Sequence, residues 1–337
     1  MVAPMPRARP GRTIAEVGEF GFLERALAQA PVGRGTLVGP GQDCALIRCG
    51  ARRCLFTVDA LVEGVHFEPG WLSPRQIGRK SFLVNASDIA AMGGRPRFCV
   101  VNLAVPSSYP ARDLHAVQRG IVEAAQRCEA SVVGGNLTRA AQLSVAIALL
   151  GDAPKRLVTR QGARVGDLVY VTGTLGDAAL AVRLLRAARA VPRSVIRRFR
   201  EPTPRLQAGR RLVESALVSA MIDVSDGLVQ DLGHLCAESR VGACIDASAV
   251  PRSPAYREAL GAADPLALHG GEDYELLCTV PERNVDRLER RRAQLGCALT
   301  RIGRITADGG VRVVDAAGRQ VALGAAGFDH FRSGLQR

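Results

Sequence analysis

Short apolar runs alternate with amphipathic stretches along most of the chain. The apolar runs contain many β-branched residues, which is typical of strands, whereas the amphipathic stretches have the spacing of helices. Strands are predicted at residues 43–49, 54–61, 98–106, 130–135 and 143–151. Helices are predicted at residues 74–92 and near 111–129. This alternation predicts a mixed α/β structure.

Residues 152–166 interrupt the pattern, which then restarts with a strand, a glycine turn and a helix. Such an interruption is typical of a domain boundary. Later strands are predicted at 167–173, 243–250, 274–280 and 311–315, and later helices at 176–189, 204–219, after 221–228, and near 283–295. We therefore predict an α/β (α+β) chain with domains at residues 14–153 and 154–337, preceded by a disordered leader at residues 1–13.

Composition supports two globular domains. The chain has 337 residues, of which 47% are hydrophobic, enough to build a core in each domain. No apolar run is long enough to span a bilayer, and no signal-type hydrophobic segment follows the basic N-terminal stretch. The nine cysteines form no CxxC pair, so we expect reduced structural thiols in a cytoplasmic protein without a membrane partner.

The formal net charge of +13 raises the question of nucleic-acid binding. The arginines are spread along the chain, as in residues 183–200 and 283–294, and no helix-turn-helix, zinc or RNA-binding signature accompanies them. Lysine occurs only at positions 80 and 155, which indicates an arginine-rich background. We therefore expect no nucleic-acid partner and a solvated or anion-attracting surface.

Aspartates in short motifs are the strongest chemical signal. The chain contains neither a Walker P-loop nor a protein-kinase glycine loop. Five aspartates instead lie among small or apolar residues, namely Asp43, Asp59, Asp88, Asp223 and Asp226. Buried carboxylates are costly unless paired, and Mg²⁺ bridges such carboxylates to phosphates, so a shared cation is one explanation. Taken singly, Asp43 could cap a turn, Asp88 could be a polar helix residue, and Asp226 could cap the helix that begins at Gly227.

Several motifs, read in order, carry a resemblance over nearly the whole chain after residue 17. They are GEFGFLERAL (18–27), GQDCALI (41–47), TVDALVEGVHF (57–67), GRKSFLVNASDIAAMGGRPR (78–97), GGNLTR (134–139), IDVSDGLVQDLGHL (222–235), GGEDYELL (270–277) and GFDHF (327–331). Together they resemble the thiamine-monophosphate kinase family. The resemblance implies a two-domain aminoimidazole-ribonucleotide synthetase-like fold, with a first domain that binds ATP and Mg²⁺ and pairs its sheet across a homodimer, and a second domain that completes the site.

The same resemblance implies an activity and a set of site residues. The activity is transfer of the ATP γ-phosphate to thiamine monophosphate, giving thiamine diphosphate. The implied metal ligands are Asp43, Thr57, Val58, Asp59, Asp88, Asn136, Asp223 and Asp226, of which Asp59, Asp88, Asp223 and Asp226 would carry catalysis. The implied ATP-binding residues are Gly135, Asn136, Arg160 and Ser225, with Gly134 beside them. The implied acceptor-binding residues are His66, Glu272 and Phe328. Phe328 could instead be a core residue, and His66 could instead cap the end of a strand.

Three positions depart from the family pattern. Gln42 stands where the family usually has an acid, and Val58 can offer only its backbone carbonyl. Asn136 also replaces an acid, so we expect the site to hold its ions more weakly or to hold fewer of them. Two alternatives follow: an ATP-dependent enzyme of the same fold with another acceptor, or a weakly catalytic ligand-binding paralogue. Lys80 is expected either to contact phosphate or to lie on a helix surface.

Overall fold

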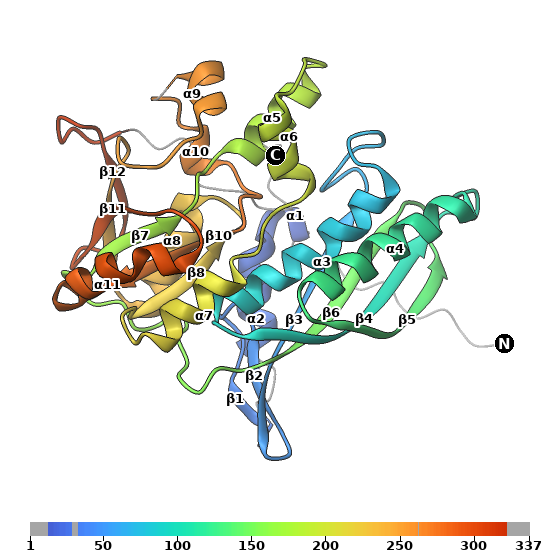
Figure 1. The fold of residues 1–337 in the computed structure, drawn as a ribbon, viewed down its shortest axis with the longest axis horizontal. Helices are drawn as coiled ribbons and strands as arrows, with labels where there is room; N and C mark the ends of the chain where they lie inside the picture. The colour runs from blue at the N-terminus through green and yellow to red at the C-terminus, as the bar shows by residue number, and fades with distance from the viewer. Residues whose placement is uncertain (1–12, 29–32, 262, 322–337) are drawn as a thin grey trace.

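Two mixed α/β domains lie side by side, each built around its own sheet (Figure 1). The computed structural model describes residues 13–28, 33–261 and 263–321. Within these residues each sheet has six strands. The predicted α/β fold is confirmed, while residues 1–12 of the predicted leader, and Phe328, lie outside the described residues.

The first sheet has the strand order β1-β2-β3-β6-β4-β5. Its strands are β1 (Thr36–Val38), β2 (Ala45–Cys49), β3 (Arg52–Val62), β4 (Arg95–Val105), β5 (Ser131–Arg139) and β6 (Ser144–Asp152). Neighbouring strands pair antiparallel except β4 and β5, which are parallel and are joined through a helix. Alternate residues of β6 are buried, as expected for a sheet covered by helices on one face.

Helices α3 (Pro74–Ala91) and α4 (Ala111–Arg127) lie side by side across that covered face (Figure 1). Ser73 caps the start of α3 by accepting a hydrogen bond from the backbone of Gln76, and proline occupies the first helical position. The two helices approach closely because Gly78 and Gly120 lie at their contact. An added Cβ would lie 1.9 Å from the Val117 carbonyl oxygen at Gly78, and 2.1 Å from the Arg75 carbonyl oxygen at Gly120.

The second sheet has the strand order β12-β9-β11-β7-β10-β8, with only β12 and β9 parallel among the described pairs. Its strands are β7 (Leu168–Thr172), β8 (Ala220–Val224), β9 (Gly242–Asp246), β10 (Glu275–Val280), β11 (Leu299–Thr306) and β12 (Gly310–Val314). Every residue of β7, β8 and β10 is buried, so this part of the sheet is covered on both faces.

Helices of the second domain surround its sheet. They are α5 (Asp177–Arg186), α6 (Arg193–Arg200), α7 (Leu206–Glu214), α8 (Leu228–Ser239), α9 (Pro254–Leu260), α10 (Leu266–His269) and α11 (Val285–Arg291), with short 3₁₀ turns at Glu282–Asn284 and Arg292–Leu295. At the N-terminal side, α1 (Ile14–Val17) and α2 (Glu19–Ala28) precede the first sheet. No helix in the described ranges is both long and apolar enough to cross a membrane.

Candidate active site

An acidic pocket of about 150 Å³ is lined by residues from both domains. The first domain contributes residues of β3 and α3, and the second contributes the turn after β8 and the segment before β10. The lining residues are Glu19, Asp59, Ala60, Leu61, His66, Val84, Asp88, Asp223, Ser225, Asp226 and Tyr274. Four of the five aspartates singled out in the sequence therefore line one pocket.

The fifth aspartate, Asp43, lies beside the same carboxylates. Single carboxylate oxygens of Asp43, Asp88 and Asp223 all lie within 4.8 Å of one another. Asp43 precedes β2, Asp88 is in α3, and Asp223 is near the end of β8. Three strongly buried or half-buried acids that converge from separate segments are a suitable donor set for a hard divalent cation.

Neighbouring polar groups orient these carboxylates. Thr57 donates to Asp88 over 2.5 Å, and Ser87 donates to Asp223 over 2.6 Å. Arg160 binds one oxygen of Asp43 at 2.8 Å. The other oxygen, Asp43 Oδ2, is buried and has no hydrogen-bond partner among the described residues. Because a buried acceptor without a partner is unfavourable, a bound cation fits this position.

The electrostatics of the cluster also favour a cation. Burial, together with the nearby carboxylate of Asp43, raises the pKa of Asp223 to about 8. Burial and the carboxylates of Asp59, Asp223 and Asp43 likewise raise the pKa of Asp88 well above its usual range. The shifts reflect the cost of holding several negative charges together away from water. A divalent cation would remove that cost.

The turn between β8 and α8 is fixed by Asp231. Its Oδ2 atom accepts hydrogen bonds from the backbone N–H groups of Ser225, Asp226 and Gly227, each at 3.0 Å. Gly227 adopts a φ of +123°, a conformation that residues with a side chain rarely adopt. Asp231 thereby holds two of the pocket residues in place from within the following helix.

Gln42, the first departure from the family pattern, has a defined role. Its side-chain oxygen accepts from the backbone N–H of Arg160 at 2.7 Å, and its amide nitrogen donates to Glu238 at 3.2 Å. Gln42 thus joins the segment before β2 to two segments of the second domain. The side chain of the next residue in the chain, Asp43, is held by the same Arg160.

The side chains of the other two departures lie together, in a pocket other than the acidic one. Val58, Gly135 and Asn136 line a depression of about 330 Å³ on the open face of the first sheet. The Asn136 amide donates to Asn102 Oδ1 at 2.9 Å. In strand β3, Thr57 and Asp59 project toward the helices because successive side chains alternate between faces, and Val58 projects to the open face.

Of the residues expected around the acceptor, His66 lies among the lining residues of the acidic pocket and Glu272 does not. His66 lines the acidic pocket, with its Nδ1 atom accepting from the backbone N–H of Val62 at 3.1 Å. Glu272 is 4% exposed and forms an ion pair with Lys80, which is fully buried. Lys80 therefore does not lie on a helix surface. Glu19 and Tyr274 were missed because an isolated acid and an isolated tyrosine carry no motif signal, although both lie inside motifs of the resemblance.

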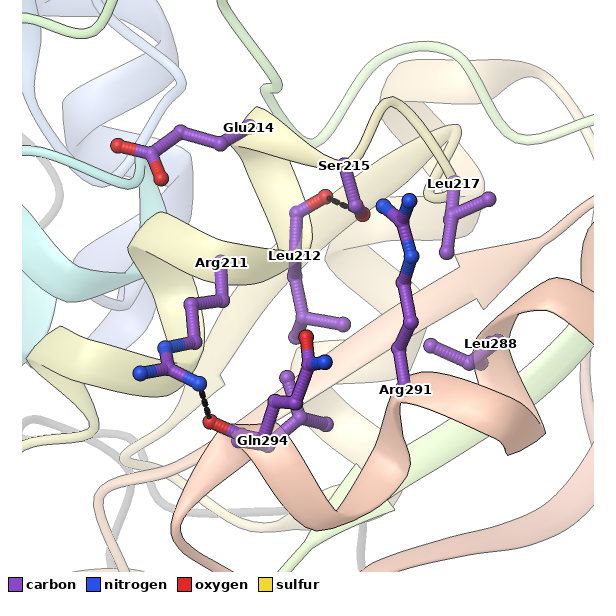
Figure 2. Close-up of a pocket in the computed structure, with 9 residues that line it drawn as sticks. Arg211, Leu212, Glu214, Ser215, Leu217, Leu288, Arg291 and Gln294 are labelled. Atoms are coloured by element: carbon purple, nitrogen blue, oxygen red, sulfur yellow. Dashed lines mark hydrogen bonds between the residues drawn. The ribbon is translucent and has the colours of Figure 1, made fainter.

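A second pocket of about 210 Å³ lies between α7 and α11 (Figure 2). Figure 2 shows Arg211 and Arg291 at its sides, with Arg211 donating to the backbone carbonyl of Gln294. Glu214 is its sole acidic lining residue among those described. It therefore lacks the convergent carboxylates that distinguish the smaller acidic pocket.

The two domains correspond to a recognised pair of families. Residues 41–153 match "AIR synthase related protein, N-terminal domain", and residues 164–316 match "AIR synthase related protein, C-terminal domain". The two-domain fold is thus that of a protein related to AIR synthase.

Individual relatives narrow the family. The chain is 36% identical to thiamine-monophosphate kinase of Escherichia coli strain K12 over 324 residues, which cover 93% of this chain and 98% of that protein. It is 33% identical to the enzyme of the same name from Pyrococcus abyssi, over 88% of this chain and 91% of that protein. The chain belongs to the thiamine-monophosphate kinase family.

Solved structures agree with this assignment. "AaThiL complexed with AMPPCP and TMP" aligns with a TM-score of 0.80 and 32% identity, covering 95% of this chain and 99% of that one. Thiamine-monophosphate kinase from Stenotrophomonas maltophilia K279a aligns with a TM-score of 0.73 and 38% identity, covering 88% of this chain and 95% of that one.

Proposed function

We propose that this chain transfers the γ-phosphate of ATP to thiamine monophosphate, producing thiamine diphosphate and ADP. The observation that carries the proposal is the convergence of Asp43, Asp88 and Asp223, from both domains, beside one pocket. Family membership supports ATP as the donor and thiamine monophosphate as the acceptor, since a relative was solved with AMPPCP and TMP. Such a transfer needs positioning and charge neutralisation more than a covalent nucleophile.

Mg²⁺ is the proposed resident cation. The residues that would hold it are Asp43, Thr57, Asp59, Asp88, Asp223 and Asp226, with the backbone of Val58 as a further proposed ligand. When bound, Mg²⁺ neutralises the charge that develops on the transferred phosphoryl group and its neighbours. The buried Asp43 Oδ2 atom, which has no hydrogen-bond partner in the described part of the chain, supports this assignment.

The protein's own groups would orient the reactants. Thr57 and Ser87 hold the carboxylates of Asp88 and Asp223 in fixed directions. Arg160, close to the same acids, is proposed to contact the nucleotide together with Ser225 and the backbone of Gly135. In the transfer, a phosphate oxygen of the acceptor forms a bond to the γ-phosphorus, and the bond to the β–γ bridging oxygen breaks to release ADP.

Three residues are proposed to contact the acceptor. His66 lines the acidic pocket and is proposed to contact thiamine monophosphate. Glu272 and Phe328 are proposed on the family resemblance, and Phe328 lies outside the described residues. Asn136 is proposed near the nucleotide, although its amide is bonded to Asn102 on the open sheet face.

The decisive experiment measures ADP release at millimolar Mg²⁺ with and without thiamine monophosphate. We expect strong stimulation by the acceptor. Asp223→Asn keeps the hydrogen bond from Ser87 but removes the negative charge, and it should lower kcat by more than about 100-fold. This loss is larger than the effect of removing a residue that only supports a metal ligand, because Asp223 is itself a proposed ligand. Asp308→Asn, a change of an acid whose side chain is 77% exposed, should leave kcat unchanged. Absence of stimulation by the acceptor would reject the proposal.

We also propose a cytoplasmic homodimer formed through the first domains, with domain limits at residues 14–153 and 154–337. The open face of the first sheet supports the dimer because it exposes apolar side chains, with Val58 65% and Val100 46% exposed. Light scattering should give twice the chain mass. Val58→Lys and Val100→Lys should shift the protein toward the monomer, and a monomeric wild-type protein would contradict this proposal.

A further inference from the structure

We infer that Lys80 is a positioning residue that sets the spacing between the two halves of the acidic cluster. This inference rests on the proposed function only through the metal site, not through the identity of the acceptor. Lys80 is in α3 of the first domain, is fully buried, and forms an ion pair with Glu272 of the second domain. Burying a lysine costs free energy unless its positive charge is paired. Lys80 can therefore be buried only where the fold provides partners for its ammonium group.

A second contact fixes the Lys80 ammonium from another side. Its Nζ atom lies 3.8 Å from the centre of the Phe199 ring, in helix α6 of the second domain. Phe199 is 1% exposed and packs edge-on against Trp71, with ring centres 6.1 Å apart. The ammonium is therefore held by a carboxylate and an aromatic face, both from the second domain.

Glu272 transmits this contact to the acidic turn. Glu272 and Tyr274 both have left-handed backbones, with φ of +73° and +50°, which is unfavourable for residues with a side chain. Their N–H groups donate to the carbonyl oxygens of Ser225 at 2.7 Å and Val224 at 2.8 Å. The segment bearing Glu272 is thus bonded directly to the turn that follows Asp223.

At its other end, Lys80 is connected to the first-domain acids through α3. Residues four, seven and eight positions later lie on the same helix face, and these are Val84, Ser87 and Asp88. Val84 and Asp88 line the acidic pocket, and Ser87 binds Asp223 across the domain boundary. Lys80 is therefore about two helical turns from Asp88 along α3. Through Glu272, it is also connected to the turn that carries the acids of the second domain.

The experiment measures Mn²⁺ binding by electron paramagnetic resonance. Mn²⁺ binding is chosen because the measurement requires neither nucleotide nor acceptor. Lys80→Met should weaken Mn²⁺ affinity by about 10-fold or more, as loss of outer partners of metal ligands does. Glu201→Gln is the matched control. It breaks an ion pair between Arg79, also in α3, and the end of α6, but both side chains are partly exposed. The control should change Mn²⁺ affinity by less than about twofold.

A double variant separates positioning from folding. Lys80→Met removes the ion pair between Lys80 and the buried carboxylate of Glu272, so the single variant could fail to fold. Lys80→Met/Glu272→Met buries two apolar side chains instead, and emission of Trp71, the single tryptophan of the chain, reports whether the junction remains packed. We expect wild-type emission with weakened Mn²⁺ binding. Wild-type Mn²⁺ affinity in either folded variant would overturn the inference.

The proposed activity can fail independently. If the wild-type protein binds Mn²⁺ but forms no ADP with thiamine monophosphate, the acceptor assignment is wrong, and the Mn²⁺ comparison of the Lys80 variants still decides the role of Lys80. If acceptor-dependent turnover is normal and Lys80→Met binds Mn²⁺ like the wild type, the inference is wrong and the proposed function stands.

Discussion

Gln42 joins the first domain to the second next to the acidic pocket. Its amide uses both of its polar ends, accepting from the backbone of Arg160 and donating to Glu238. A carboxylate at this position could accept but not donate, and it would face another carboxylate. The glutamine at position 42, where the family usually has an acid, therefore suits the neighbouring Glu238, which accepts a hydrogen bond from its amide although it is distant in sequence.

Gln42→Asp should consequently destabilise the protein. The side chain is one methylene shorter and carries a charge that Glu238 repels, so we expect the unfolding free energy in urea to fall by about 1 kcal/mol or more. The double variant Gln42→Asp/Glu238→Gln should recover part of this loss because the repulsion is removed. An increase in stability for Gln42→Asp alone would show that the observed bridge contributes nothing.

At the same scale, the sequence predicted which acids lie together but not their surroundings. Asp43, Asp88 and Asp223 were identified because each lies in a short motif, and the structure brings them together. The pairing of Glu272 with Lys80 was not predicted. The two residues are 192 positions apart, and no local sequence pattern indicates a buried ion pair over that separation. Pairings of this kind depend on how the two domains pack.

Among the secondary-structure elements, α3 and α4 are packed unusually closely. At Gly78 and Gly120 the backbone of one helix occupies the place that a side chain would need on the other. Because both neighbours are backbone atoms, they cannot move aside without shifting a helix. The position of α3 also sets the positions of Asp88 and Lys80, which belong to the proposed metal site and its proposed support.

Gly120→Ala should therefore lower the unfolding free energy by about 1–3 kcal/mol, the usual cost of overpacking. The control is Gly233→Ala in α8, where an added Cβ would meet no atom within 4 Å. That change should raise stability by about 0.5–1 kcal/mol, because alanine favours a helix over glycine. Chemical denaturation of both variants checks the prediction, and equal effects would contradict it.

The turn before α8 provides a second prediction for an element. Asp231→Ala removes the acceptor of three backbone N–H groups and should lower kcat by about 10–100-fold, as loss of outer support does. Asp231→Asn keeps a side-chain oxygen and should retain more activity than Asp231→Ala. ADP release at saturating Mg²⁺ measures both variants. Equal loss in both would mean that the charge, and not the hydrogen bonds, holds the turn.

Elements with an uninterrupted pattern were predicted better than elements whose pattern is interrupted. The helix predicted at 74–92 is observed as Pro74–Ala91, because its periodicity, cap and proline all indicate the same start. Strand β11, Leu299–Thr306, was missed because arginines and a glycine interrupt its apolar pattern, and it pairs with β7 and β9 from distant segments. The helix predicted at 204–219 ends at Glu214, since β8 begins at Ala220.

For the whole molecule, the clustered acids contributed by the two domains make the unfolding free energy depend on pH. In the folded, metal-free protein the pKa of Asp223 is raised to about 8 from its usual 3.8. Between these values the folded state binds more protons than the unfolded chain. The unfolding free energy therefore falls as pH rises through this window.

We expect the melting temperature in EDTA to decrease between pH 5 and pH 8, measured by calorimetry. Added Mg²⁺ should raise the melting temperature more at pH 8 than at pH 5, because the cation binds the ionised acids. Asp223→Asn should flatten the decrease, whereas Asp308→Asn should not. A melting temperature that rises with pH in EDTA would contradict the raised pKa.

The division of the acids also bears on how such a protein can evolve. Asp43, Asp59 and Asp88 belong to one domain, and Asp223 and Asp226 to the other. A recombination event that exchanged one domain for that of a distant relative would keep both folds but bring together carboxylates that had not been selected to match. The two domains are therefore expected to be inherited as a single unit, even though each has its own sheet.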